Sequence, residues 1–191
     1  MSLHSLVFWF LWAVWLMMET VVNVRARRLR QQATSTAVRA DQGSVWLIFG
    51  GMYLLILIAF FFSMNGIGRM PSWVPVVGNA VMACGIVMRY SAITQLGRYF
   101  SLTVQISSHQ TLLQTGWYHR IRHPAYTGGW LIAVGLGLSL DTWVGTLVIA
   151  VGLLAIYRRR ISVEEQALVQ YFGSAYERYR QHTYYMFPGI W

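Results

Sequence analysis

Long apolar segments separated by arginine-rich polar segments dominate the chain. A helix needs about 20 apolar residues to cross about 30 Å of hydrocarbon. Three segments reach that length, at residues 6–24, 45–64 and 73–93. The pattern therefore predicts three membrane-spanning helices within residues 1–94.

Two shorter apolar runs follow, at residues 126–140 and 143–157, with a two-residue linker between them. At about 1.5 Å per residue, each run covers only about 22 Å. They predict a helical hairpin that either crosses a thinned membrane with tilt or stops short of the far surface. Residues 161–180 then show the apolar spacing of one more helix, with Ser162 as its N-cap.

Composition supports a membrane protein. The chain is 56% hydrophobic and only 11% charged, whereas soluble domains average about 25% charged residues. Its 191 residues fit one domain. We expect an all-α integral membrane protein with about five transmembrane helices and a cytoplasmic cofactor pocket. Residues 1–94 form the three N-terminal spans, and residues 95–191 form loops, hairpin and C-terminal helix.

The net charge of +9 comes from arginine alone. A basic chain raises nucleic acid as a partner, but these arginines lie at the ends of apolar spans. That placement indicates membrane topology and lipid headgroups instead, so we expect no nucleic-acid partner. Arg69 is the only arginine between the second and third spans, whereas the other arginines outside the spans follow the first span, the third span or the hairpin. The distribution predicts an outside N-terminus, with the polar segments and the C-terminus on the cytoplasmic side of a bacterial inner membrane.

Two ionisable clusters bracket the hairpin, at residues 122–126 and 160–165. Charged groups packed against membrane spans are costly, which makes them functional candidates. The helix start at His123-Pro124 also offers free N–H groups to an anion. Arg160 and Glu164 have the i, i+4 spacing of a helical ion pair worth about 0.3–0.5 kcal/mol. Both clusters lie at the same end of the hairpin and can meet.

Residues inside the spans carry two further expectations. Glu19, Asn23 and Arg89 lie near the cytoplasmic ends of their spans, so they should pair with one another or extend to the interface.

Paired glycines, at positions 50 and 51 and at positions 135 and 137, predict closely packed helices.

Several classes of site are excluded by what the sequence contains. The single Cys84 rules out a disulfide framework within the chain and cysteine-based metal clusters. His119 and His123 are four apart, but a third ligand is missing and Pro124 disturbs the helix that such a metal site needs. No glycine-rich nucleotide loop follows a strand, which excludes a soluble dinucleotide-binding domain. We therefore expect no metal.

Residues 95–191 resemble the isoprenylcysteine carboxyl methyltransferase family of integral membrane enzymes, which is related to the phospholipid N-methyltransferases. The matching residues occur in order across about half the chain. They are Leu96-Gly97, Phe100-Ser101, Thr111-Leu112-Leu113, Gly116, Tyr118, Arg122-His123-Pro124, Tyr126, Gly128, Arg160, Glu164-Glu165, Leu168, Phe172-Gly173, Tyr176, Tyr179 and Pro188.

The resemblance implies S-adenosylmethionine as cofactor, in a pocket formed by the cytoplasmic loops and the final helices. It assigns catalytic roles to Arg160 and Glu164, and it places Arg160 at the polar group of a lipophilic substrate. The implied cofactor contacts are Gln105, Gln110, Thr111, Leu112, Leu113, Tyr118, His123, Pro124, Ala125, Tyr126 and Glu164.

The expected function is methyl transfer to a lipophilic acceptor at the membrane, with a prenylcysteine-type carboxylate as the leading candidate. Alternative acceptors are a phospholipid headgroup, methylated on nitrogen, and a small lipophilic molecule, methylated on sulfur or oxygen. Two other classes stay open: a non-catalytic membrane scaffold, and a sterol-reductase-like enzyme that uses a nicotinamide. The sequence does not predict the oligomeric state.

Overall fold

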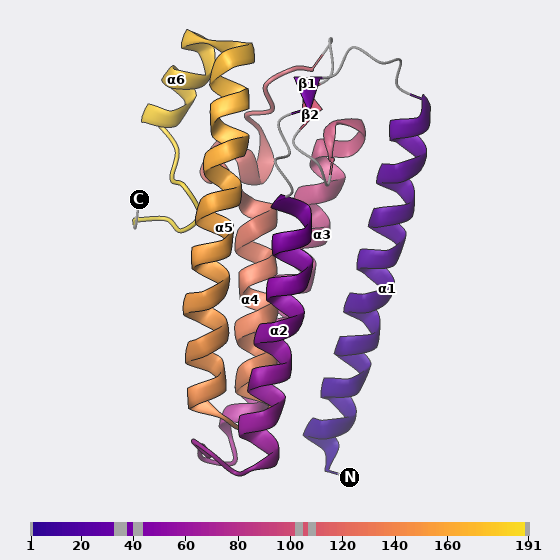
Figure 1. The fold of residues 1–191 in the computed structure, drawn as a ribbon, viewed down its shortest axis with the longest axis vertical. Helices are drawn as coiled ribbons and strands as arrows, with labels where there is room; N and C mark the ends of the chain where they lie inside the picture. The colour runs from indigo at the N-terminus through magenta and orange to yellow at the C-terminus, as the bar shows by residue number, and fades with distance from the viewer. Residues whose placement is uncertain (1, 33–37, 40–43, 102–104, 107–109, 190–191) are drawn as a thin grey trace.

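Five long helices run side by side in the described part of the chain, and each is antiparallel to the next one along the sequence (Figure 1). The computed structural model describes residues 2–32, 38–39, 44–101, 105–106 and 110–189. The long helices are α1 (Leu3–Gln32), α2 (Ser44–Met64), α3 (Val74–Leu96), α4 (Pro124–Ser139) and α5 (Trp143–Phe172). The shorter elements are β1 (Val38–Arg39), η1 (Gly97–Tyr99), β2 (Gln105–Ile106), η2 (Gly116–His119) and α6 (Ser174–Gln181).

The three predicted spans are confirmed as α1, α2 and α3. The stretches long and apolar enough to cross a membrane are Leu3–Ala26 in α1, Leu47–Met64 in α2, and Val74–Tyr99, which comprises α3 and η1. The strand pairing in the described residues is a two-residue antiparallel pairing of β1 with β2 and an isolated parallel bridge between Ile121 and Tyr184. The chain is therefore an all-helical integral membrane protein with a small strand pair at one end of the bundle.

The predicted hairpin is confirmed as α4 and α5, and its turn lies against the α2–α3 connection. Trp143 N–H donates to the Gly68 carbonyl at 2.8 Å, and the Thr142 hydroxyl donates to the Ile67 carbonyl at 2.8 Å. The Asp141 carboxylate accepts from the Met70 N–H at 2.9 Å. The hairpin therefore reaches the same end of the bundle as α2 and α3 rather than stopping short of it.

The helix predicted over residues 161–180 is confirmed except at Gly173, but its predicted start at Ser162 is wrong. α5 continues without a break from Trp143 to Phe172, so Ser162 lies inside a helix and does not cap one. Residues 158–165 contain no glycine or proline, and nothing local interrupts the helix where its composition turns polar. The break comes at Gly173, whose φ of 53° favours glycine, and α6 follows it.

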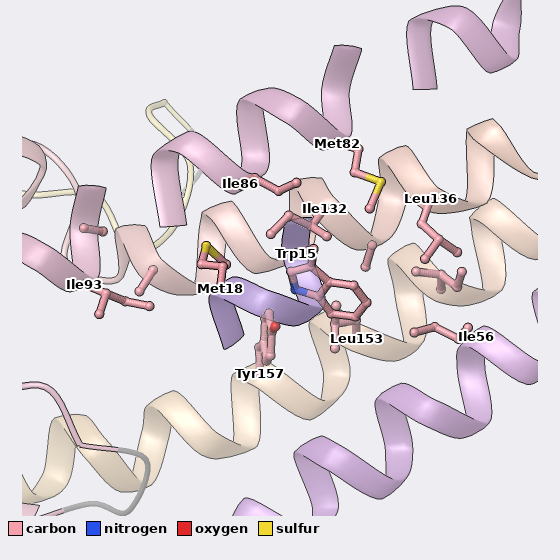
Figure 2. Packing of buried hydrophobic residues seen from close by; sticks show 14 of the residues in the cluster. Trp15, Met18, Ile56, Met82, Ile86, Ile93, Ile132, Leu136, Leu153 and Tyr157 are labelled. Carbon is pink, nitrogen blue, oxygen red and sulfur yellow. The ribbon is translucent and has the colours of Figure 1, made fainter. Parts of the chain in front are cut away.

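Apolar side chains from all five long helices form the core (Figure 2). The labelled members are Trp15 and Met18 of α1, Ile56 of α2, Met82, Ile86 and Ile93 of α3, Ile132 and Leu136 of α4, and Leu153 and Tyr157 of α5. The core thus extends along the bundle, and the ionisable clusters lie near its arginine-rich end.

Glycines bring α3 and α4 into backbone contact. A Cβ at Gly85 would lie 2.6 Å from the Ile132 nitrogen and 2.8 Å from the Gly128 carbonyl oxygen. A Cβ at Gly135 would likewise meet the backbone of Met82. Small residues at helix crossings permit this close approach within membranes. The predicted role is confirmed for Gly135.

The same role is wrong for Gly50, because no atom lies within 4 Å of a Cβ built there. Its helix, α2, packs mainly through other positions, including Gly51, where a Cβ would meet the Ile156 side chain.

Gly85→Ala should destabilise the protein by about 1–3 kcal/mol, because the new methyl group must push two backbones apart. Gly50→Ala is the matched control, and it should be neutral or stabilising by up to about 1 kcal/mol. Thermal unfolding of the detergent-solubilised protein measures both. Equal melting temperatures for the two variants would contradict the close contact between α3 and α4.

Candidate active site

A cavity opens between the long helices near the arginine-rich end of the bundle. Its volume is about 180 Å³, against about 10–15 Å³ for a single water, so it has room for a ligand. All five long helices contribute to its wall, together with residues of the segments that follow α3. The cavity therefore connects the polar end of the bundle with its apolar interior.

Most of the predicted site residues line this one cavity. They are Gln110, Thr111, Leu112, Leu113, Tyr118, His123, Ala125, Tyr126, Arg160 and Glu164.

The other two predicted residues are Pro124 and Gln105. Pro124 is the first residue of α4 and is buried just behind the wall. Gln105 lies in β2, and its side chain is outside the described part of the chain. The functional roles of all twelve predicted site residues remain predictions. The structure places ten of these residues around the cavity.

The Tyr126 hydroxyl links the two clusters that bracket the hairpin. It donates to Glu164 Oε2 at 2.9 Å and accepts from Arg160 Nε at 3.3 Å. Arg160 is only 2% exposed, so its guanidinium is held against the cavity rather than in solvent. Tyr126 lies in the first turn of α4 while the other two residues lie on α5, and the three side chains therefore fix these helices relative to each other.

Glu165 organises the base of the site, a role that sequence reasoning missed. Its Oε1 accepts from Arg122 Nε at 2.9 Å and from the Tyr176 hydroxyl at 3.3 Å, and it lies 3.2 Å from His123 Nε2. His123 itself is 4% exposed. A buried carboxylate is tolerated only with such partners.

Electrostatics agree with the geometry around Glu165, which lies beyond the apolar part of α5. Burial by itself would raise its pKa, but the hydrogen bonds and charges of His123 and Arg122 outweigh burial and lower the pKa to about 2. Burial, followed by the nearby carboxylate of Glu165, raises the pKa of Tyr176 far above its usual value. The tyrosine therefore stays protonated and serves as a hydrogen-bond donor.

The segment after α6 packs against the start of α4. Arg122 N–H donates to the Tyr184 carbonyl at 2.8 Å, and His123 N–H donates to the Tyr185 carbonyl at 3.2 Å. The Arg122 guanidinium also donates to the carbonyls of Arg180 and Thr183. Because His123 N–H is engaged in this way, the helix start offers an anion fewer donors than the sequence suggested.

Glu19 and Arg89 form the expected ion pair, and both line the cavity. Arg89 Nη2 donates to Glu19 Oε2 at 3.0 Å, while Nη1 donates to the Ala125 carbonyl at 3.0 Å. Asn23 takes no part in this pairing, because its Oδ1 is buried with no hydrogen-bond partner among the described residues. The ion pair joins α1 and α3 to the first turn of α4.

Comparison with known proteins matches this same region. Residues 77–170, about half the chain, fit the profile of the isoprenylcysteine carboxyl methyltransferase family. The protein-S-isoprenylcysteine O-methyltransferase of Schizosaccharomyces pombe is 35% identical over 102 residues, which are 52% of this chain and 43% of that protein. Protein-S-isoprenylcysteine O-methyltransferase B of Arabidopsis thaliana is 32% identical over 113 residues, 58% of this chain and 57% of that protein.

The chain belongs to the isoprenylcysteine carboxyl methyltransferase family. A solved structure of a eukaryotic intramembrane Ras methyltransferase of this family superimposes with a TM-score of 0.61 at 25% identity. The match covers 78% of this chain and 53% of that one. The chain spans about half the length of the curated relatives it matches.

The family match contains both clusters and Glu165, but it ends before Tyr176 and the segment after α6. Sequence reasoning missed the central position of Glu165 because two of its partners, Tyr176 and Arg180, lie on α6. A signal was nevertheless present, since Glu165 is an acidic residue directly beside the predicted catalytic Glu164.

Glu165 should make stability depend on acid. Because its folded pKa is lowered, its contribution is complete above the unfolded pKa, about 4.3, and is lost as pH falls towards 2. At neutral pH that contribution is about 1–2 kcal/mol, because solvent screens part of the interaction. Glu165→Gln should therefore lower the melting temperature at pH 7 and flatten its decline between pH 5 and about 3.

Thermal unfolding across this range measures the effect. Glu177→Gln is the control, because Glu177 is exposed on α6, and it should keep the wild-type profile. A Glu165→Gln profile parallel to the wild type would contradict the assigned role of the carboxylate.

Proposed function

We propose that the chain is an S-adenosylmethionine-dependent methyltransferase that modifies a lipophilic acceptor, foremost a prenylcysteine-type carboxylate. The observation that carries this proposal is the cavity itself. It holds Glu164, Tyr126 and Arg160 at its polar end and extends between apolar side chains of α1 and α2. The names of the relatives, protein-S-isoprenylcysteine O-methyltransferases, support the same reaction.

The residues around the cavity fit the proposed cofactor. Its sulfonium and ammonium groups are positive, and the Glu164 carboxylate can balance that charge or accept hydrogen bonds from the ribose hydroxyls. Leu112, Leu113 and Tyr118 supply apolar and aromatic surface for the adenine ring. When bound, the cofactor supplies a methyl group on a sulfur that is already an activated leaving group.

The other end of the cavity fits a lipid tail. Trp15 of α1 and Ile48, Phe49 and Met52 of α2 line it, and these helices belong to the apolar part of the bundle. A lipophilic acceptor can therefore keep its chain among apolar side chains while its polar group reaches Arg160. This arrangement supports entry of the acceptor directly from the bilayer.

Arg160 fits an acceptor that carries an anionic group. A guanidinium is permanently charged and binds a carboxylate or a phosphate through two parallel hydrogen bonds. It therefore suits a prenylcysteine-type carboxylate and equally the phosphate of a phospholipid headgroup. A carboxylate also needs no base before it accepts a methyl group. The protein's task is then to hold the acceptor in line at attack distance and to exclude water.

The arginine-rich end of the bundle, where the cavity opens, faces the cytoplasm in this proposal, and the membrane is a bacterial inner membrane. The support is the arginine distribution, since positively charged segments remain on the cytoplasmic side. The cofactor would then enter from the cytosol and the acceptor from the bilayer.

Calorimetric titration of the folded, detergent-solubilised protein with S-adenosylhomocysteine tests the cofactor site. The wild type should bind, and Glu164→Ala should weaken binding about tenfold or more, because a charge-assisted hydrogen bond is lost. An unchanged affinity in Glu164→Ala would remove this residue from the cofactor site. Absence of binding by the wild type would favour a non-catalytic scaffold.

Arg160 should behave differently. Arg160→Gln should leave S-adenosylhomocysteine affinity within about threefold while reducing turnover about a hundredfold or more, since a charged contact to the reacting acceptor is lost. Its neighbour Arg159 is exposed, and Arg159→Gln serves as the control with turnover close to wild type. Equal loss of cofactor binding in the Glu164 and Arg160 variants would reject the division between cofactor and acceptor.

A further inference from the structure

A second hollow lies on the arginine-rich end of the molecule, between η2 and α6. It is separate from the cavity described above and shares only Tyr179 with it. We call it the basic hollow, and the side chains that define its character are Gln114, His119, Arg120, Arg178, His182 and Tyr184. Neither the family match nor the proposed methyl transfer gives this hollow a role.

The basic hollow gathers positive charge without a counter-charge. Of the described residues that line it, none is acidic. Arg178 Nη1 donates only to the neutral Ser174 hydroxyl, at 3.3 Å. In the described part of the chain, no carboxylate forms an ion pair with Arg120 or Arg178. This includes the carboxylate of Glu177, which precedes Arg178 on α6. The hollow can therefore take an anion without displacing an existing ion pair.

The hollow lies where the apolar part of α4 begins. Tyr184, in its wall, donates its N–H to the Arg120 carbonyl at 2.9 Å. From there the chain continues along α4, where the Met186 carbonyl accepts from the Thr127 hydroxyl at 2.7 Å. The Phe187 ring then packs 5.1 Å from that of Trp130. Residues 184–187 thus run from the hollow to the apolar part of α4. The hollow therefore lies at the depth of the lipid headgroups.

We propose that the basic hollow binds the phosphate group of an anionic lipid headgroup. Arg120 and Arg178 supply the fork-shaped donors that suit phosphate oxygens. Basic pockets beside transmembrane helices on the cytoplasmic side are suited to such headgroups. Tyr184, 43% exposed, adds the amphipathic ring typical of the membrane interface.

An occupant of the basic hollow would touch the segment that holds the start of α4. Thr183, in the wall of the hollow, donates its hydroxyl to the Tyr179 carbonyl at 2.6 Å and accepts the Arg122 guanidinium at its own carbonyl. The Tyr179 hydroxyl in turn donates to the Tyr118 carbonyl at 2.7 Å. A bound headgroup would therefore brace the wall that separates the hollow from the cavity.

Calorimetric titration of the full, detergent-solubilised chain tests the proposal without any methyl-transfer assay. The probes are dihexanoyl-phosphatidylglycerol, dihexanoyl-phosphatidylcholine and inorganic phosphate. The anionic lipid should bind more tightly than both others. Equal affinity for inorganic phosphate would mean that a free phosphate is the occupant, and equal affinity for the zwitterionic lipid would mean that charge is not recognised. Either result overturns the proposal.

The double variant Arg120→Gln with Arg178→Gln should weaken phosphatidylglycerol binding about thirtyfold, the effect of losing two arginines at the membrane surface. The matched control is Arg25→Gln with Arg28→Gln, which removes the same charge from exposed positions on α1 at the same end of the bundle. The control should change affinity less than about threefold. Equal losses in the two double variants would indicate general surface charge and would contradict a defined site.

Discussion

The buried carboxylate of Glu165 is the interaction on which the rest of the site depends. A charge removed from water is costly unless donors surround it, and here Arg122, His123 and Tyr176 do so. These donors come from the start of α4 and from α6, while the carboxylate belongs to α5. One acidic side chain thus holds the polar ends of three helices together where the bundle leaves its apolar zone.

The neighbouring polar contacts extend this constraint to the cavity. Arg122 also donates to the Thr183 carbonyl in the segment after α6, and Tyr126, in the first turn of α4, joins Arg160 to Glu164. From Gly128 to Gly135, backbone contact between α3 and α4 at their glycines leaves little freedom for the hairpin to slide. Helix packing therefore sets the positions of the charged side chains of the candidate site, while the irregular segment at residues 110–113 supplies another part of its wall.

Much of this architecture could be predicted from the sequence, because lipid imposes a simple length rule. Apolar runs of about 20 residues gave α1, α2 and α3, and the two shorter runs gave the hairpin. The clusters at residues 122–126 and 160–165 were also expected to meet, since a hairpin brings its ends together. Hydrophobic pattern and chain connectivity were sufficient for these features.

The features that the sequence did not predict depend on contacts between polar segments. Glu165 finds partners from α6, and polar residues carry no periodic signal that reveals such pairing. The continuous α5 was missed because its composition changes near residue 158, although no residue there breaks a helix. Gly50 was misread because a glycine pair does not reveal which face of a helix meets a neighbour.

The most direct test of the proposed methyl transfer is an assay of the purified protein in lipid nanodiscs with methyl-labelled S-adenosylmethionine. The acceptors offered are an S-prenylated cysteine with a free carboxylate and, separately, phosphatidylethanolamine. The predicted result is label on the prenylcysteine, released as methanol by mild base because the product is a methyl ester. Label confined to the amine lipid, or no transfer by folded protein that binds the cofactor, would contradict the proposal.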